Sequence, residues 1–206
     1  MGTMGDNNGT MGDSLRVFRL TRTSEQEKEN ILAAARHAPL SSPRLLTLAD
    51  GPPGVLPRGF VHDLSRTEIG RGWRIFVAAR EALQRWEQFD LGWVRIANPI
   101  PKIILGELVA VEAYTAYLWS ININRIVETV DSPTSFGFIY ATTSLHVEEG
   151  QERFVVEFDT ESESVLYRIE AVSRPRNILA RVGYPFSRAM QHRFTRDSHA
   201  RMKCSV

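Results

Sequence analysis

The sequence predicts an α+β fold in which a curved antiparallel sheet of about seven strands wraps around a long C-terminal helix. First, five successive segments between residues 107 and 173 are rich in β-branched and aromatic residues. Second, the links between them are mostly too short for parallel crossovers. Third, the last segment of the chain carries an apolar stripe at helical spacing, which suits the apolar face of such a sheet.

The five central strands are predicted at residues 107–116, 119–130, 135–144, 151–160 and 165–173. In the fourth, Phe154, Val156 and Phe158 alternate with polar Arg153 and Glu157. This period of two gives the strand one apolar and one wetter face. Turn-forming residues at 131–133, 148–150 and 161–164 separate the strands, so hairpins join them into a meander.

The N-terminal part is predicted as an extension of the sheet domain. Residues 1–13 repeat Met, Gly, Asp and Asn and are expected to be a disordered tail. Residues 15–21 suit a short strand. Ser24 and Glu27 form a capping-box pattern at the start of a helix over 24–37. A connection rich in proline and glycine follows at 39–58.

A strand, a helix and another strand are predicted before the meander. The strand covers 60–69, and Gly70 and Gly72 turn the chain into a helix over 73–87. The second strand covers 91–98, because Pro99 ends it. The apolar residues of the helix recur at spacings of three and four: Trp73, Phe76, Val77, Ala79, Leu83 and Trp86.

The final helix is expected to begin with Asn177 as its cap. Its stripe consists of Val182, Phe186, Met190 and Phe194, and Pro185 within it predicts a kink or a break. A bent sheet that holds this helix would leave a cavity between them, whereas a flat sheet would leave a filled core. The predicted domain runs from 14 to 206, with the extension at 14–58 and the core at 59–206.

Composition excludes several classes of protein. A net charge of +1 argues against a polyanion binder, so no nucleic-acid partner is expected. The one cysteine, Cys204, cannot form an intrachain disulfide, which fits a reducing compartment. No apolar run reaches membrane-spanning length and no signal pattern opens the chain, so the predicted location is cytoplasmic.

Motifs for cofactors and catalysis are missing. Gly70 and Gly72 fail the dinucleotide pattern because Ile75 stands at the third glycine position. His146 lies near Glu148, Glu149 and Glu152, but without a tight constellation these suit a solvated acidic turn better than a metal site. We therefore assign no catalytic residue, no metal ligand and no cofactor, and expect binding rather than catalysis.

Charge is distributed unevenly along the chain. Residues 148–170 carry eight acids against two arginines, and residues 174–203 carry eight bases against Asp197. A solvated helix face complementary to an acidic sheet explains this best. The alternative is a basic helix that docks on anionic lipid or nucleic acid.

Aromatic residues of the strands are the candidate ligand-binding set. If they share the concave face, they line either a packed core or an apolar pocket with polar tips from the tyrosines. Arg125 and Glu157 are further strand residues with a possible cavity role, although a surface position is favoured for both. The candidate ligand-binding residues are Trp93, Trp119, Phe138, Tyr140, Phe154, Phe158 and Tyr167.

Several separated motifs together resemble one known family. They are the segments at 89–94, 135–142 and 149–154, with His146 between the last two, then 173–175 and 179–185. In this order they are similar to the bacterial and plant family called domain of unknown function 1990 (UPF0548-like), over roughly 15–201. Ile139 and residues 141–143 depart from a more glycine-rich family pattern.

The resemblance implies the helix-grip (START-like) fold, shared by birch-pollen-allergen-like proteins, lipid carriers and aromatase/cyclases. It supplies no catalytic residues. The function we expect is the binding of a small hydrophobic or amphipathic molecule between the sheet and the C-terminal helix. An enzyme of cyclase or hydrolase type that uses the same cavity, and an interaction module on the basic helix, remain alternatives.

Overall fold

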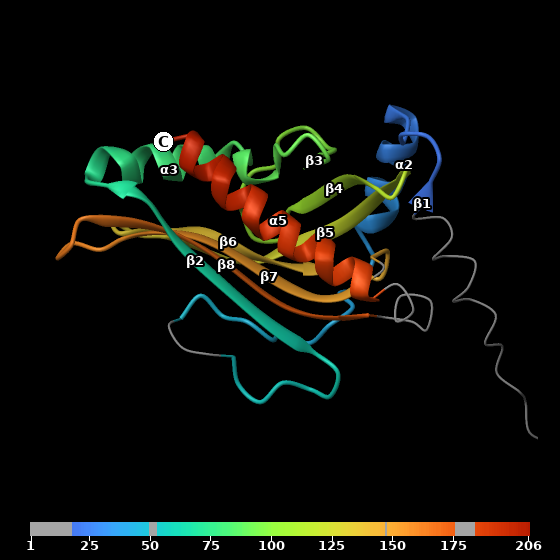
Figure 1. The fold of residues 1–206 in the computed structure, drawn as a ribbon. Coiled ribbons are helices and arrows are strands. Elements are labelled where there is room, and N and C mark those ends of the chain that lie inside the picture. The colour runs from blue at the N-terminus through green and yellow to red at the C-terminus, as the bar shows by residue number, and fades with distance from the viewer. Residues whose placement is uncertain (1–17, 50–52, 147, 176–183) are drawn as a thin grey trace, which may run out of the picture.

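A computed structural model describes residues 18–49, 53–146, 148–175 and 184–206. One antiparallel sheet runs in the order β2-β8-β7-β6-β5-β4-β3, and a short β1 pairs with β5 (Figure 1). The strands are β1 (Phe18–Arg19), β2 (Val61–Arg71), β3 (Val94–Ile96), β4 (Leu108–Thr115), β5 (Leu118–Asp131), β6 (Ser135–Thr142), β7 (Glu148–Phe158) and β8 (Ser164–Pro175). The predicted α+β class and the five-strand meander β4–β8 are confirmed.

Helices close the ends and the concave face of this sheet. They are α2 (Glu25–Ala35), α3 (Trp73–Gln84), the 3₁₀ turn η1 (Glu87–Phe89) and α5 (Tyr184–Cys204). In Figure 1 the long red helix α5 lies across the curved sheet, as the predicted helix-grip fold requires. No helix in the described ranges is both long and apolar enough to cross a membrane.

The predicted helix start at Ser24 is confirmed. Ser24 Oγ accepts from the backbone N–H of Glu27 at 3.3 Å, and the Glu27 carboxylate accepts from the backbone N–H of Ser24 at 3.1 Å. The helix predicted over 73–87 ends earlier, at Gln84, because Trp86 takes a left-handed conformation with φ 61°. This break starts η1 and directs Phe89 into the core.

Two predicted strand boundaries change: β7 starts earlier than predicted because strand pairing outweighs a local turn signal, and β3 is shorter than predicted. The prediction placed a turn at 148–150, but β7 begins at Glu148, which pairs with Pro175 of β8. Gly150 suits this strand because a Cβ there would lie 2.3 Å from the carbonyl oxygen of Val172. The strand predicted over 91–98 shortens to three residues, with Gly92 at φ 76° before it.

Pro185 lies at the start of the described part of α5, which begins at Tyr184. The kink or break predicted at Pro185 falls at the edge of the described residues and stays a prediction. The predicted cap Asn177, the stripe residue Val182 and the tail at 1–13 lie outside the described residues.

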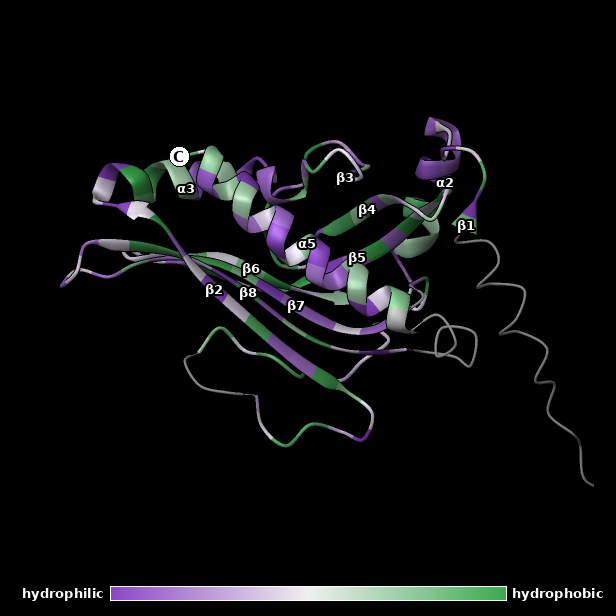
Figure 2. Cartoon of the chain, in the orientation of Figure 1, coloured by the Kyte–Doolittle hydropathy of each residue, from purple (hydrophilic) through white to green (hydrophobic). Residues whose placement is uncertain are grey.

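The main core lies between the sheet, α3, η1 and α5. Phe76, Phe89, Phe138, Phe154 and Tyr167 are among its fully or almost fully buried side chains. Smaller clusters cover the opposite face of the sheet, one under α2 and one under the segment around Leu46. Figure 2 shows hydrophilic and hydrophobic residues alternating along α5 and β2, as elements with one buried side require.

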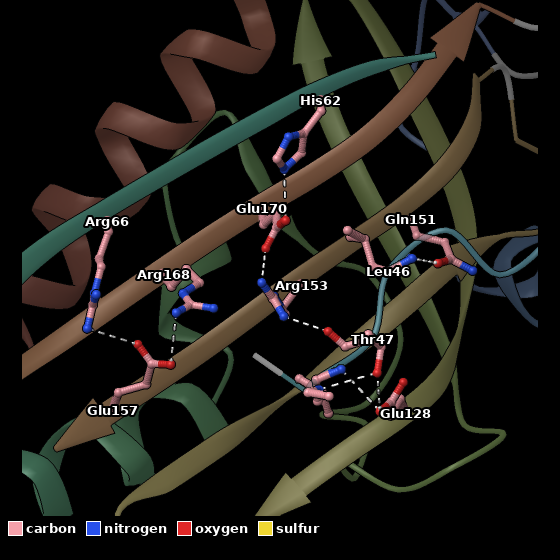
Figure 3. Close-up of polar contacts among 12 residues, drawn as sticks. Leu46, Thr47, His62, Arg66, Glu128, Gln151, Arg153, Glu157, Arg168 and Glu170 are labelled. Carbon is pink, nitrogen blue, oxygen red and sulfur yellow. Dashed lines mark hydrogen bonds and ion pairs between the residues drawn. The ribbon is translucent and has the colours of Figure 1, made fainter. Parts of the chain in front are cut away.

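Polar side chains hold the segment around Leu46 to the outer face of the sheet (Figure 3). Arg153 pairs with Glu170 and donates to the carbonyl of Thr47 at 2.5 Å, and His62 Nε2 lies 2.8 Å from Glu170. Gln151 Oε1 accepts from two backbone N–H groups, those of Leu45 at 2.9 Å and Leu46 at 2.8 Å. The outer face is therefore a structural surface, and the concave face remains for a site.

Candidate functional site

A cavity of about 590 Å³ lies between the concave face of the sheet and α5. One part of its wall is apolar and aromatic, and another part is polar and charged. Phe89, Trp93, Val111, Met190 and Phe194 belong to the apolar part. Residues of β4–β8, β2 and α5 together form the lining, so the cavity exists only once α5 has packed on the sheet.

Strand β5 turns a row of small polar side chains toward this cavity. Ser120, Asn122 and Asn124 line it, while Ile121 and Ile123 between them are buried on the opposite face against α2. The alternation follows from the period of two in a strand.

A second polar row crosses the sheet at right angles to the strands. In the strand register Tyr140 is opposite Glu152, Glu152 is opposite Ala171, and Ala171 is opposite Asp63. All four line the cavity. The hydroxyl of Tyr140 donates to Glu152 Oε2 at 2.6 Å.

Helix α5 joins this row through two side chains one turn apart. Arg188 pairs with both carboxylate oxygens of Asp63, with Nη2 to Oδ1 at 2.7 Å. Gln191 Nε2 donates to Glu148 Oε2 at 3.0 Å. These contacts fix α5 over the polar part of the cavity.

The carboxyl groups at this end have shifted pKa values. Removal from water raises the pKa of Glu152 from 4.5 to about 7; the hydrogen bond from Tyr140 opposes this shift, and the charges of Glu148 and Asp63 add to it. Burial also raises the pKa of Glu148. The hydrogen bond from Arg188 instead lowers the pKa of Asp63. Near neutral pH, Glu152 can therefore gain or lose a proton.

The raised pKa of Glu152 predicts a fall in stability with rising pH. Between about 4.5 and about 7 the folded protein holds this proton more firmly than the unfolded chain, so the free energy of unfolding decreases across that window. Glu152→Gln should make the decrease smaller, with Glu148 responsible for the remainder. At pH near 8 we expect the variant to be about 2 kcal/mol more stable than the parent.

Urea unfolding at several pH values measures this effect. Glu157→Gln is the matched control, because Glu157 lies on the same strand but pairs with Arg66 and Arg168 on the outer face. A Glu152→Gln variant with the parental pH profile would contradict the prediction.

The structure brings two of the seven candidate ligand-binding residues to the cavity, Trp93 and Tyr140. The Trp93 indole donates to Asp197 of α5 at 3.0 Å. Phe138, Phe154 and Tyr167 are 0% exposed and fill the core instead, with the Tyr167 hydroxyl 3.1 Å from Ser198 Oγ. Core filling was the alternative that the sequence left open for these aromatic rings.

The other two candidates lie away from the cavity. Phe158 packs against Trp73 and Phe76 of α3, at ring-centroid distances of 5.7 and 5.9 Å. Trp119 stands one residue before Ser120 and therefore faces the outer side, where it packs on Tyr114 at 4.8 Å.

Arg125 and Glu157 do not line the cavity either. Arg125 donates to the carbonyls of Ala35 and Arg36 at the end of α2, at 2.8 and 3.1 Å. The surface position favoured for Arg125 and Glu157 agrees with these outer-face contacts.

The sequence interpretation missed the role of the acidic segment. Glu148, Glu149 and Glu152 were expected in a solvated turn, but β7 carries Glu148 and Glu152 into the cavity wall. Glu149 pairs with Arg174. The spacing of four between Glu148 and Glu152 was a usable signal, because it puts both on one face of a strand. Within the described ranges no three His, Cys, Asp or Glu side chains gather as metal ligands.

Phe89 and the β5 row were also missed. Phe89 lies in a 3₁₀ turn that the sequence did not predict, and it contacts Tyr140, Phe154 and Phe194. Ser120, Asn122 and Asn124 alternate with the apolar residues Trp119, Ile121 and Ile123, a pattern that could have indicated a polar row facing a cavity.

Acidic side chains of the same protein engage the basic helix. Arg188 pairs with Asp63, and Arg201 pairs with Glu87 and Asp90. Arg193 and Arg196 both contact Asp197. The basic helix therefore does pair with acidic side chains, but these pairs involve Asp63, Glu87, Asp90 and Asp197, and not the acidic strand residues 148–170 that the sequence suggested.

Comparisons with known proteins identify related sequences. A family model described as "Domain of unknown function (DUF1990)" matches residues 47–201. A UPF0548 protein of Dictyostelium discoideum is 32% identical over 155 residues, 70% of this chain and 72% of that protein. A UPF0548 protein of Arabidopsis thaliana is 27% identical over 146 residues, 68% of this chain and 70% of that protein. Among solved structures, Ara h 8.0201 aligns with a TM-score of 0.46 and 10% identity, covering 70% of this chain and 98% of that chain.

Proposed function

The chain belongs to the DUF1990 family, and we propose that it binds a small amphipathic molecule in the cavity between the sheet and α5. The cavity itself carries the proposal. Its volume of about 590 Å³ lies within the range of about 300–1,000 Å³ usual for small-molecule sites. Its aromatic wall suits an apolar body, and its polar end suits a hydrogen-bonding head group.

Two of the sequence-predicted residues keep their proposed role. Trp93 and Tyr140 would contact the ligand directly, and Phe89 and Phe194 would add to the apolar wall. Native mass spectrometry of the purified protein tests for a ligand that remains bound. A mass shift that disappears on denaturation supports the proposal, and the released molecule can then be identified.

Filling the cavity provides a direct test with a neutral apolar dye. Ala113 lines the cavity from β4, so Ala113→Phe should occupy space that a ligand needs. We expect the Kd of Nile red to increase at least about tenfold. The matched control is Ala200→Phe, which adds the same volume at an exposed position of α5. Equal dye binding by both variants and the parent would contradict binding in this cavity.

An enzymatic use of the same cavity is the second candidate, and one observation favours it. Glu152, with a pKa of about 7 and a hydrogen bond from Tyr140, could donate or accept a proton near neutral pH. Turnover of an identified ligand that Glu152→Gln abolishes, without loss of ligand binding, would support this function. An interaction role for α5 has less support, because several of its arginines pair within the protein.

A further inference from the structure

The polar end of the cavity contains amide oxygens that have no hydrogen-bond partner in the part of the chain that the structure describes. Asn124 is 2% exposed and lines the cavity, yet its Oδ1 has no hydrogen-bond partner among the described residues. The Oδ1 of Asn122, the neighbouring cavity-lining residue of β5, also has no hydrogen-bond partner within the described ranges. A buried amide without a partner is costly, so such groups are expected to bind something.

The strand register places Asn122 and Asn124 of β5 beside the polar row that contains Tyr140 and Glu152. Ile126 is opposite Tyr140 on β6 and Asn124 is opposite Thr142, so Asn124 and Tyr140 are diagonal neighbours. Such neighbours lie roughly 7–8 Å apart, close enough for one small head group to contact both. Tyr140 uses its only proton on Glu152 Oε2, which leaves Glu152 Oε1 for a ligand. The unsatisfied amide atoms are the Oδ1 oxygens of Asn122 and Asn124, which are hydrogen-bond acceptors, as is Glu152 Oε1 when the carboxyl is ionised.

The charges around Glu152 are mainly negative. Asp63 faces it from β2 and Glu148 from β7, with Tyr140 of β6 and Tyr167 of β8 nearby. The other titratable groups of the cavity wall are His146, Arg188 and His192. Arg188 is already engaged with both oxygens of Asp63 and with Gln191 Oε1. A positive charge placed here would be attracted by Glu148 and Glu152.

We propose that this polar end binds the ammonium group of an amphipathic amine, with the carboxyls of Glu148 and Glu152 and the amide of Asn124 as acceptors. The inference rests on the proposed function, because the apolar body of the amine would occupy the aromatic part of the cavity. An ammonium supplies three N–H donors and one positive charge, which match a site rich in acceptors and negative charge.

Three probes that share one alkyl chain test the head group. Decylamine, decanol and decanoate are titrated calorimetrically below their micelle-forming concentrations. At pH near 8 we expect decylamine to bind at least about tenfold more tightly than decanol, and decanoate to bind most weakly.

The pH dependence gives a second readout. Decylamine remains protonated below pH of about 10, as lysine does, so a change of affinity between pH of about 6 and about 8 reports on the protein. Affinity for decylamine should increase with pH as Glu152 loses its proton, whereas affinity for decanol should stay constant. In Glu152→Gln, decylamine should bind no better than decanol and its pH dependence should largely disappear. Glu157→Gln, on the outer face of the same strand, is the control and should behave as the parent.

The outcomes separate the two proposals. Equal binding of all three probes keeps the cavity function and overturns the amine site. Tightest binding of decanoate also overturns it and would point to Arg188 as the recognising group. If no probe binds, and Nile red does not bind either, the proposed function itself fails. Asn124→Leu, with an unfolding measurement to show that it folds, should reduce the preference for decylamine over decanol by several-fold.

Discussion

Arg153→Met is expected to lower the free energy of unfolding by about 3–5 kcal/mol. Arg153 and Glu170 are 3% and 1% exposed, and they pair on the outer face of the sheet. Loss of the guanidinium leaves the Glu170 carboxylate buried, with His62 at 2.8 Å as its remaining side-chain partner in the described part of the chain. It also removes the hydrogen bond to the Thr47 carbonyl, which holds the segment around Leu46 to the sheet.

Chemical denaturation of a small set of variants measures this cost. Arg168→Met is the matched control, because Arg168 lies on the same face and pairs with the more exposed Glu157 at 3.3 Å. We expect the control to lose less than about 1 kcal/mol. The double variant Arg153→Met with Glu170→Met should recover much of the stability, since no buried charge is left unpaired. Equal losses for Arg153→Met and Arg168→Met would contradict the proposed role of the buried pair.

Phe89→Ala should cost a similar amount, about 3–5 kcal/mol, for a different reason. Phe89 is 2% exposed, and its ring lies 5.4 Å from Phe154 in the sheet and 5.1 Å from Phe194 in α5. Truncation removes these contacts and leaves a void where the helix meets the sheet. We therefore expect amide hydrogen exchange in α5 to increase more than exchange in β7 and β8.

Phe186→Ala is the matched control for this truncation. Phe186 lies on α5, the helix that Phe89 packs against, and it lines the same cavity, but it is 46% exposed. Its loss should change the free energy of unfolding by less than about 1 kcal/mol. If both variants lost the same stability, or if exchange rose uniformly over the protein, Phe89 would not be the residue that anchors α5.

The two residues Arg153 and Phe154 illustrate what alternation along a strand can predict. The sequence assigned Phe154 to an apolar face and Arg153 to the opposite one, and the structure agrees. The sequence predicted that the opposite face would be largely exposed to water. At Arg153 this face is buried instead, because the segment around Leu46 covers it. Such coverage joins residues about a hundred positions apart, and local pattern carries no information about it.

Site prediction failed and succeeded for related reasons. Trp93 and Tyr140 reached the cavity, while Trp119 faced outward because its neighbour Ser120 occupies the inward position. Trp119 was selected only because it is apolar. That property does not distinguish the two faces of β5, because other parts of the protein cover both faces. Glu152 was missed because its raised pKa depends on burial and on the nearby charge of Asp63, which is remote in sequence.

The sequence by itself determined the fold class, the order of its elements and the antiparallel meander, because these follow from local periodicity and from the length of the connections. Tertiary structure alone decided which side chains line the cavity and which fill the core. That choice depends on register, on the break at Trp86 and on where α5 lies over the sheet, and each of these is fixed by contacts between distant segments. The polar end of the cavity, with its unpaired amides and raised carboxyl pKa values, exists only because those contacts remove it from water.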